Sequence, residues 1–274
     1  MDLLERVIKK NNPRLYNNIE KEVLLFQKKH SGARDKVLQD DIFRIIEELD
    51  GLDLLLFPIK DEEFCGFICE YKGENFIYIN TDLPLAKQIF AAAHELYHYI
   101  NDGHRELLQS NIINENEEEI LELEESKANL FAALLLVPDD SLKKELELLK
   151  IKTENDLDQL KLIKLMDIFA VPYKTIVLRL FEIELLNEDE TRKWLSIPDR
   201  SKNQGVFKQI KKHKIGERWQ KRTREIKYSN LQTLIYDNDE FELLPKNKIK
   251  SSRGDFHSPL TEPYVRANVY GSSK

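Results

Sequence analysis

The chain alternates between stretches of helical and strand-like hydrophobic spacing. In residues 38–49, hydrophobic positions recur every three or four residues, which is typical of an amphipathic helix. These positions are Leu38, Ile42, Ile45, Ile46 and Leu49. Three strand-like runs follow at 53–59, 64–71 and 75–80, and Lys72-Gly73-Glu74 predicts a hairpin turn between the last two. The pattern predicts a helix followed by a small antiparallel sheet.

Longer helical patterns dominate the next hundred residues. One covers Leu85–Ile100 without an internal Gly or Pro, and a second covers 116–137 and is ended by Pro138. Helices at 160–169 and 173–186 have a helix-turn-helix spacing, but the second offers few basic residues for phosphates. We interpret this pair as packing of the core, with DNA binding as the alternative. The fold class expected is α+β.

The ends of the chain differ from its middle. Residues 1–30 predict one or two helices broken at Asn11-Asn12-Pro13. We expect an N-terminal helical segment at 1–35, a main domain at 36–190 and a basic C-terminal extension of unknown role at 191–274. Within that extension, 231–244 has the composition of a strand or two, and 251–274 resembles a tail.

Composition favours a soluble protein of the reducing cytoplasm. The chain has 274 residues, of which 41% are hydrophobic and 33% charged. It contains no run of 18 apolar residues, and its N-terminus lacks the pattern of a secretion signal. Cys65 and Cys69 lie four apart in a strand-like run, which is too far for a disulfide.

Charge is distributed unevenly along the chain. The net charge is −7, but residues 201–274 hold 16 Lys and Arg against 8 Asp and Glu, so the first 200 residues carry −15. A basic block interleaved with aromatic residues begins the extension. It includes Lys208, Lys211, Lys212, Lys214, Arg218, Lys221, Arg222 and Arg224. Such a block can bind nucleic acid, form a solvated helix, or dock on an acidic partner or on this chain's own acidic body.

One short motif carries most of the chemical information. His94-Glu95-Leu96-Tyr97-His98 is a complete H-E-x-x-H. Two His four apart on a helix share one face and can bind one Zn²⁺ as neutral imidazoles. Glu95, at the flank of that face, can take a proton from a metal-bound water without being a ligand.

A catalytic zinc site needs a third protein ligand. The helix predicted at 116–137 offers Glu125, which lies four residues before Asn129 and shares a face with small alanines. We predict that Glu125 binds the metal and that Asn129 orients one of the ligands. Glu124 is the competing choice for the third ligand.

These two segments together resemble a known family. The run 90–100 followed by 125–138 is similar to the ImmA/IrrE metallopeptidases, which pair H-E-x-x-H with E-x-x-A-N-x-F-A-A-x-L-L-x-P. The resemblance implies zinc ligands at His94, His98 and Glu125, and Glu95 as the general base. The family often has Gly where this chain has Tyr97, and Met where it has Val137.

The resemblance also implies a function. The implied protein is a cytoplasmic zinc endopeptidase that cleaves a helix-turn-helix repressor and so relieves repression of prophage, mobile-element or stress genes. An edge strand of the sheet can hold the substrate by strand addition, the alternative being a purely structural sheet. Tyr97, Tyr173 and Asn80 are further candidates for an oxyanion or substrate contact. The alternative function is a DNA-associated regulator, or a sensor linked to a toxin or to defence, whose metal site is structural or idle.

Overall fold

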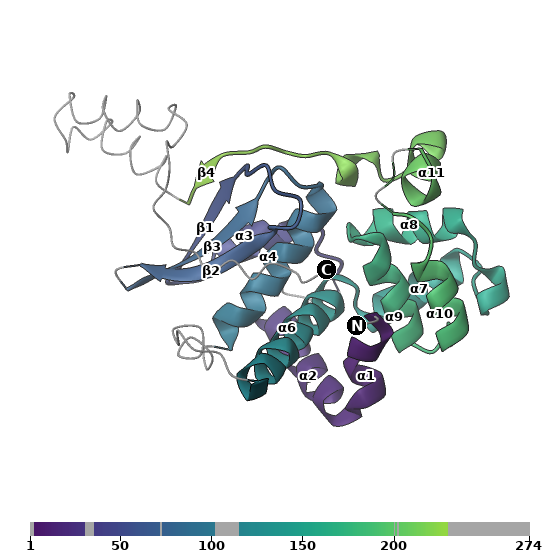
Figure 1. Ribbon diagram of the computed structural model, residues 1–274, viewed down its shortest axis with the longest axis horizontal. Helices are drawn as coiled ribbons and strands as arrows, with labels where there is room; N and C mark the ends of the chain where they lie inside the picture. Colours follow the sequence, from purple (N-terminus) through teal and green to yellow (C-terminus); the bar gives the residue numbers. More distant parts are fainter. Residues whose placement is uncertain are drawn as a thin grey trace.

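The computed structural model describes residues 3–30, 36–71, 73–101, 115–199, 201 and 203–229. A small sheet forms one end of the molecule, and helices build the rest around it (Figure 1). The α+β class is therefore confirmed. The first helical elements are η1 (Leu3–Arg6), α1 (Ile8–Asn11), α2 (Pro13–His30) and α3 (Asp41–Glu47).

The sheet has four strands in the order β2-β3-β1-β4. Their bounds are β1 (Leu52–Phe57), β2 (Gly66–Tyr71), β3 (Glu74–Asn80) and β4 (Lys227–Tyr228). One face is apolar and packs into the core beside α3. Its buried residues are Leu52, Leu54, Leu56, Ile77 and Ile79.

The prediction of a purely antiparallel sheet is wrong for the central pair of strands. The hairpin β2–β3 is antiparallel, as expected, and so is the pair β1–β4. However, β3 pairs with β1 in parallel, with Leu54 opposite Ile77. The hairpin folds back so that β3, rather than β2, lies beside β1. The connection between β1 and β2 must therefore pass over the end of β3.

Asn80 holds that connection in place. Its side chain is fully buried at the end of β3, and its Oδ1 accepts hydrogen bonds from the backbone N–H of Ile59 and of Asp82. Its Nδ2 donates to the carbonyls of Asp61 and Phe64. The amide thus satisfies backbone groups of the crossing loop that no strand pairs with.

Two long helices form the middle of the molecule. They are α4 (Leu85–Ile100) and α6 (Glu115–Leu136), and they lie next to each other beneath the sheet (Figure 1). The predicted start and end of α4 are confirmed, and those of α6 differ by one residue at each end. Ala91, Ala92 and Ala93 on α4 are buried, as are Ala128 and Ala132 on α6, and such small side chains let the helices approach closely.

The remaining helices form a second group, in which α9 packs on α8 and α10, and α11 packs on α8. They are α7 (Asp139–Leu148), η3 (Glu154–Asp156), α8 (Gln159–Phe169), α9 (Tyr173–Glu182), α10 (Glu188–Leu195), α11 (Gly205–His213) and η4 (Glu217–Gln220). Arg179 of α9 is completely buried, with hydrogen bonds to the Val137 carbonyl, the Tyr16 hydroxyl, Asp139 and Glu182. A guanidinium committed in this way is unavailable for DNA phosphates, in line with our interpretation of this helix pair as core packing.

The segment after α11 runs back to the sheet. It passes through η4 and along the start of α4, and ends as β4 on β1 (Figure 1). The backbone N–H of Leu85 donates to the Lys221 carbonyl at 2.9 Å, and that of Arg224 to the Thr81 carbonyl at 3.0 Å. Residues 221–229, which we call the strap, thus tie the extension to the beginning of α4. The strand predicted at 231–244 and the tail at 251–274 lie outside the described residues.

Candidate metal centre and active site

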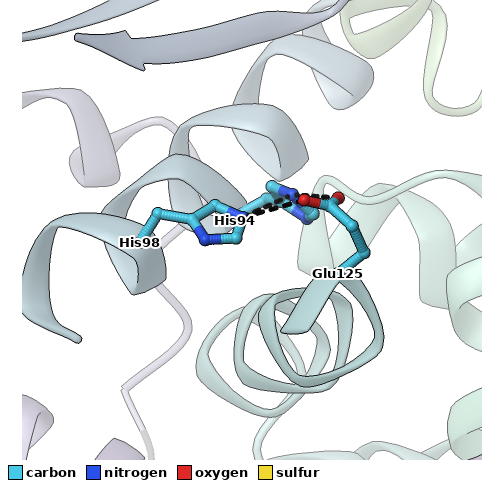
Figure 2. A group of neighbouring side chains, drawn as sticks. All are labelled: His94, His98 and Glu125. Carbon is cyan, nitrogen blue, oxygen red and sulfur yellow. Dashed lines mark hydrogen bonds and ion pairs between the residues drawn. The ribbon is translucent and has the colours of Figure 1, made fainter. Parts of the chain in front are cut away.

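Helix α4 presents both motif histidines on one side (Figure 2). His94 and His98 are one turn apart, and their Nε2 atoms lie 3.3 Å from each other. Both side chains are only partly exposed, at 14% and 21%. Because the two Nε2 atoms are so close, both ring nitrogens face the same small region between the side chains and not bulk water.

Helix α6 supplies a carboxylate that closes the group. Glu125 reaches across to the two rings (Figure 2), with Oε2 3.1 Å from His94 Nε2 and Oε1 3.4 Å from His98 Nε2. One ligand atom from each of the three residues lies within 4.8 Å of the others. Donors around a tetrahedral Zn²⁺, with bonds of about 2.0–2.1 Å, are roughly 3.3–3.4 Å apart. The donor types and their spacing therefore fit a single metal ion.

The two adjacent glutamates of α6 have different surroundings. The Glu125 side chain is 60% exposed and faces the histidines, whereas that of Glu124 is 7% exposed. Glu124 accepts hydrogen bonds from the Tyr97 hydroxyl and the Lys127 ammonium group. Of the two candidates for the third ligand, the structure brings Glu125 to the histidines.

Asn129 contacts the other nitrogen of His94. Its Oδ1 lies 3.1 Å from His94 Nδ1, one helical turn beyond Glu125. An amide oxygen accepts, so Nδ1 carries a proton, and Nε2 is the nitrogen that is left to bind a metal. This is the contact expected of a residue that orients a ligand.

Electrostatics couple the three donors. Burial alone would lower the pKa of His94, but the hydrogen bond to Glu125 and the charges of Glu95 and Glu125 outweigh it and raise that pKa. Burial would raise the pKa of Glu125, yet hydrogen bonds to both histidines and their charges hold it far below its usual value. The carboxylate is therefore ionised, as a metal ligand must be.

Glu95 lies against the sheet at the flank of this group. Glu95 is 9% exposed. This burial raises the pKa of its carboxyl, although a hydrogen bond with the backbone of Ile68 acts in the opposite direction. Gly66 makes the close approach of β2 possible, because a Cβ there would lie 2.7 Å from the Tyr78 carbonyl oxygen and 3.5 Å from Glu95 Cγ. A glycine inside a strand pattern is the only sequence signal of this approach.

The remaining substrate-contact candidates have internal partners. Tyr173 is 2% exposed and donates its hydroxyl to the Trp194 carbonyl at 3.1 Å. Asn80 is occupied by the loop that crosses β3. Tyr97 is 4% exposed and faces Glu124, and burial raises its pKa so that the hydroxyl keeps its proton. All three residues form internal hydrogen bonds, and their contact with a substrate stays a prediction.

The three arginines of the basic block form ion pairs with the acidic body of the chain. Arg218 pairs with Asp40, Arg224 pairs with Asp82, and Arg222 pairs with both Glu62 and Asp82. Lys221 belongs to the strap that runs beside α4. The other four lysines are exposed on or directly after α11. They are Lys208, Lys211, Lys212 and Lys214. Docking on the chain's own acidic residues, one of three interpretations of this block, therefore applies to its three arginines.

Comparison with known proteins agrees with this geometry. Residues 51–181 match the family model Peptidase_M78, described as the IrrE N-terminal-like domain. This part of the chain is an ImmA/IrrE domain. The match includes all the motif residues and both helices of the metal group, so the ImmA/IrrE domain belongs to a metallopeptidase family and has a cluster that can hold a metal.

Other comparisons add little about function. A solved structure described as a Mycobacterium tuberculosis transcriptional regulator aligns with a TM-score of 0.40 and 16% identity. That alignment covers 64% of this chain and 49% of the other, so the chain spans about half the length of that protein. No curated protein matches the chain. Among the described helices, none has the length and apolar character required to cross a bilayer.

Proposed function

We propose that this protein is a zinc-dependent endopeptidase that cleaves a helix-turn-helix repressor in the cytoplasm and so relieves transcriptional repression. The observation that carries the proposal is the convergence of His94, His98 and Glu125, with Glu95 beside them, within an ImmA/IrrE domain. Nitrogen and carboxylate donors in a set of three suit a catalytic zinc, which leaves a fourth position for water or substrate. Cys65 and Cys69 are not joined in a disulfide, which is compatible with a reducing compartment.

The chemistry follows from the positions of these residues. When bound, zinc supplies Lewis-acid chemistry: it lowers the pKa of a water and polarises the scissile carbonyl. Glu95 accepts a proton from the attacking water and delivers it to the leaving amine. Burial raises the pKa of Glu95 above its usual value, which makes the carboxylate a stronger base for the proton of the water. The hydrogen bond with Ile68 holds its carboxylate in one orientation.

The edge of the sheet suits an extended substrate. The Asn80 N–H donates to the Cys65 carbonyl, so Cys65 and every second residue after it face β3. The backbone groups of Gly66 and Ile68 then point away from β3, toward the outer edge beside Glu95. A peptide added there as a further strand would run past the general base.

The test uses purified helix-turn-helix repressors from the same genome as candidate substrates. The purified protein with Zn²⁺ is expected to cut one of them at one site, with the fragments identified by mass spectrometry. Glu95→Gln is expected to retain zinc and to cut about 10²–10⁴-fold more slowly, the usual contribution of a general base. Glu122→Gln, the same change at an exposed position on α6, is the matched control and is expected to cut normally. Cleavage by Glu95→Gln at the wild-type rate would exclude the mechanism.

A further inference from the structure

Tyr97 lies between the two helices that carry the metal group. Its hydroxyl is 3.4 Å from Glu124 Oε2, and its ring centroid is 5.6 Å from that of Phe131. Glu124 and Phe131 are seven residues apart, which is about two helical turns, so they lie on the same side of α6. A single side chain of α4 therefore contacts α6 at two points along one line.

The third ligand depends on how α6 is rotated. The Glu125 side chain is 60% exposed, so the packing of its own atoms contributes little to its position. Glu124, its neighbour, is buried and is offset from it by about 100° around the helix axis. The two glutamates are adjacent on one helix. A contact that holds Glu124 against Tyr97 of α4 therefore also fixes the direction of Glu125, which faces His94 and His98.

The same tyrosine also contacts a ligand directly. The ring of Tyr97 lies edge to face with that of His98, at 5.7 Å between centroids and 74° between planes. This contact limits the rotation of the His98 ring, whose Nε2 must face the shared centre. Tyr97 thus touches the elements that present two of the three donors.

We propose that Tyr97 is a positioning residue for the metal site. Its hydroxyl binds Glu124 and sets the rotation of α6 that brings Glu125 to the two histidines. This inference rests on the proposed function, because it requires that the three residues bind a metal. It assigns Tyr97 no contact with the substrate or with the metal.

The test measures zinc affinity, which is independent of cleavage. Tyr97→Phe removes the hydroxyl and keeps the ring against Phe131 and His98. We expect its Kd for zinc, measured by competition with a chromophoric chelator, to rise about tenfold, as for partners that orient metal ligands. The matched control is Tyr99→Phe on the same helix, whose hydroxyl donates to the Asp50 carbonyl at 3.0 Å. The control is expected to bind zinc as the wild type does.

Substitutions at the acceptor test the link to Glu124. Glu124→Gln keeps an oxygen for the tyrosine, and we expect its Kd to stay within about threefold of wild type. Glu124→Ala removes that oxygen and is expected to weaken zinc binding about as much as Tyr97→Phe. The double variant Tyr97→Phe/Glu124→Ala should then bind no more weakly than either single variant, because the two changes remove one interaction.

The outcomes separate this inference from the proposed function. A wild-type protein that fails to bind zinc contradicts the proposed function itself. If the wild type binds zinc and Tyr97→Phe has the same Kd, the positioning role is excluded. A lower melting temperature for Tyr97→Phe with unchanged zinc affinity would also exclude it, since that is the result of a purely structural contact. Should Tyr97→Phe not fold, unchanged zinc affinity in Glu124→Ala would overturn the proposal.

Discussion

Asn129 Oδ1 lies 3.1 Å from His94 Nδ1 and joins α6 to α4 beside the metal group. Because the amide oxygen can only accept, the proton of His94 is on Nδ1. Nε2, on the other side of the ring, then faces Glu125, whose Oε2 is 3.1 Å away. One hydrogen bond thus fixes both the tautomer and the direction of a ligand.

Removing this hydrogen bond should weaken the metal site. Asn129→Ala is expected to raise the Kd for zinc about 10–100-fold, because His94 loses the partner that orients it. Zinc titration against a competing chelator measures the change. Ser126→Ala, on the same helix, loses only a local hydrogen bond to the Glu122 carbonyl and serves as the control. Equal affinities for the two variants would contradict the role of Asn129.

Zinc should stabilise the folded protein through the paired histidines. A ligand that binds only the folded state at 100 times its Kd adds about 2.7 kcal/mol. This corresponds to a rise in Tm of roughly 5–10 °C for a chain of this size. His98→Ala is expected to abolish the zinc-dependent rise in differential scanning fluorimetry. His213→Ala, at an exposed position on α11, should retain it. A rise of equal size in His98→Ala would place the zinc elsewhere.

The local features of the site were accessible from sequence because they depend on spacing within single helices. His94 and His98 must share a face once α4 forms, and Glu125 and Asn129 must do so on α6. The choice between Glu124 and Glu125 was harder, because both positions border the same helix face. It depends on the rotation of α6 against α4, which is set by tertiary contacts at Tyr97 and Phe131.

Strand order was inaccessible for a related reason. The strand pattern around the hairpin is the same whether β2 or β3 lies next to β1, so alternation alone cannot show a parallel pair. In the structure, the buried side chain of Asn80 binds the loop that crosses β3, which exists only in this strand order. In the sequence, however, Asn80 is indistinguishable from any other polar residue at the end of a strand. The strap was missed as well, because two residues of β4 are too short to give a strand signal.

Gly66 should be required for the position of the general base. A Cβ at residue 66 would lie 2.7 Å from the Tyr78 carbonyl oxygen, which belongs to the backbone of the neighbouring strand and cannot move away cheaply. Gly66→Ala is therefore expected to shift β2 relative to Glu95. We expect cleavage to fall at least tenfold, consistent with the sensitivity of catalysis to small displacements. Zinc affinity should be unchanged, because the ligands lie on α4 and α6.

The control for this substitution lies in the hairpin turn. Gly73 has a φ of 83°, and a Cβ there meets nothing within 4 Å. Asn tolerates that backbone region better than other side chains do. Gly73→Asn should therefore keep both cleavage and zinc binding. Full activity in Gly66→Ala would show that β2 does not set the position of Glu95.

Trp219 should anchor the strap to the helical part of the molecule. Its side chain is 5% exposed, and its Nε1 donates to Asp167 Oδ1 of α8 at 2.8 Å. From there the chain continues to the bonds with Thr81 and Leu85 at the start of α4. Trp219→Ala is expected to cost about 3–5 kcal/mol, as for a buried aromatic residue, and to lower Tm by roughly 10 °C. Phe207→Ala, at a half-buried position on α11, should have a clearly smaller effect. If the two variants melt at the same temperature, Trp219 is not the residue that anchors the strap.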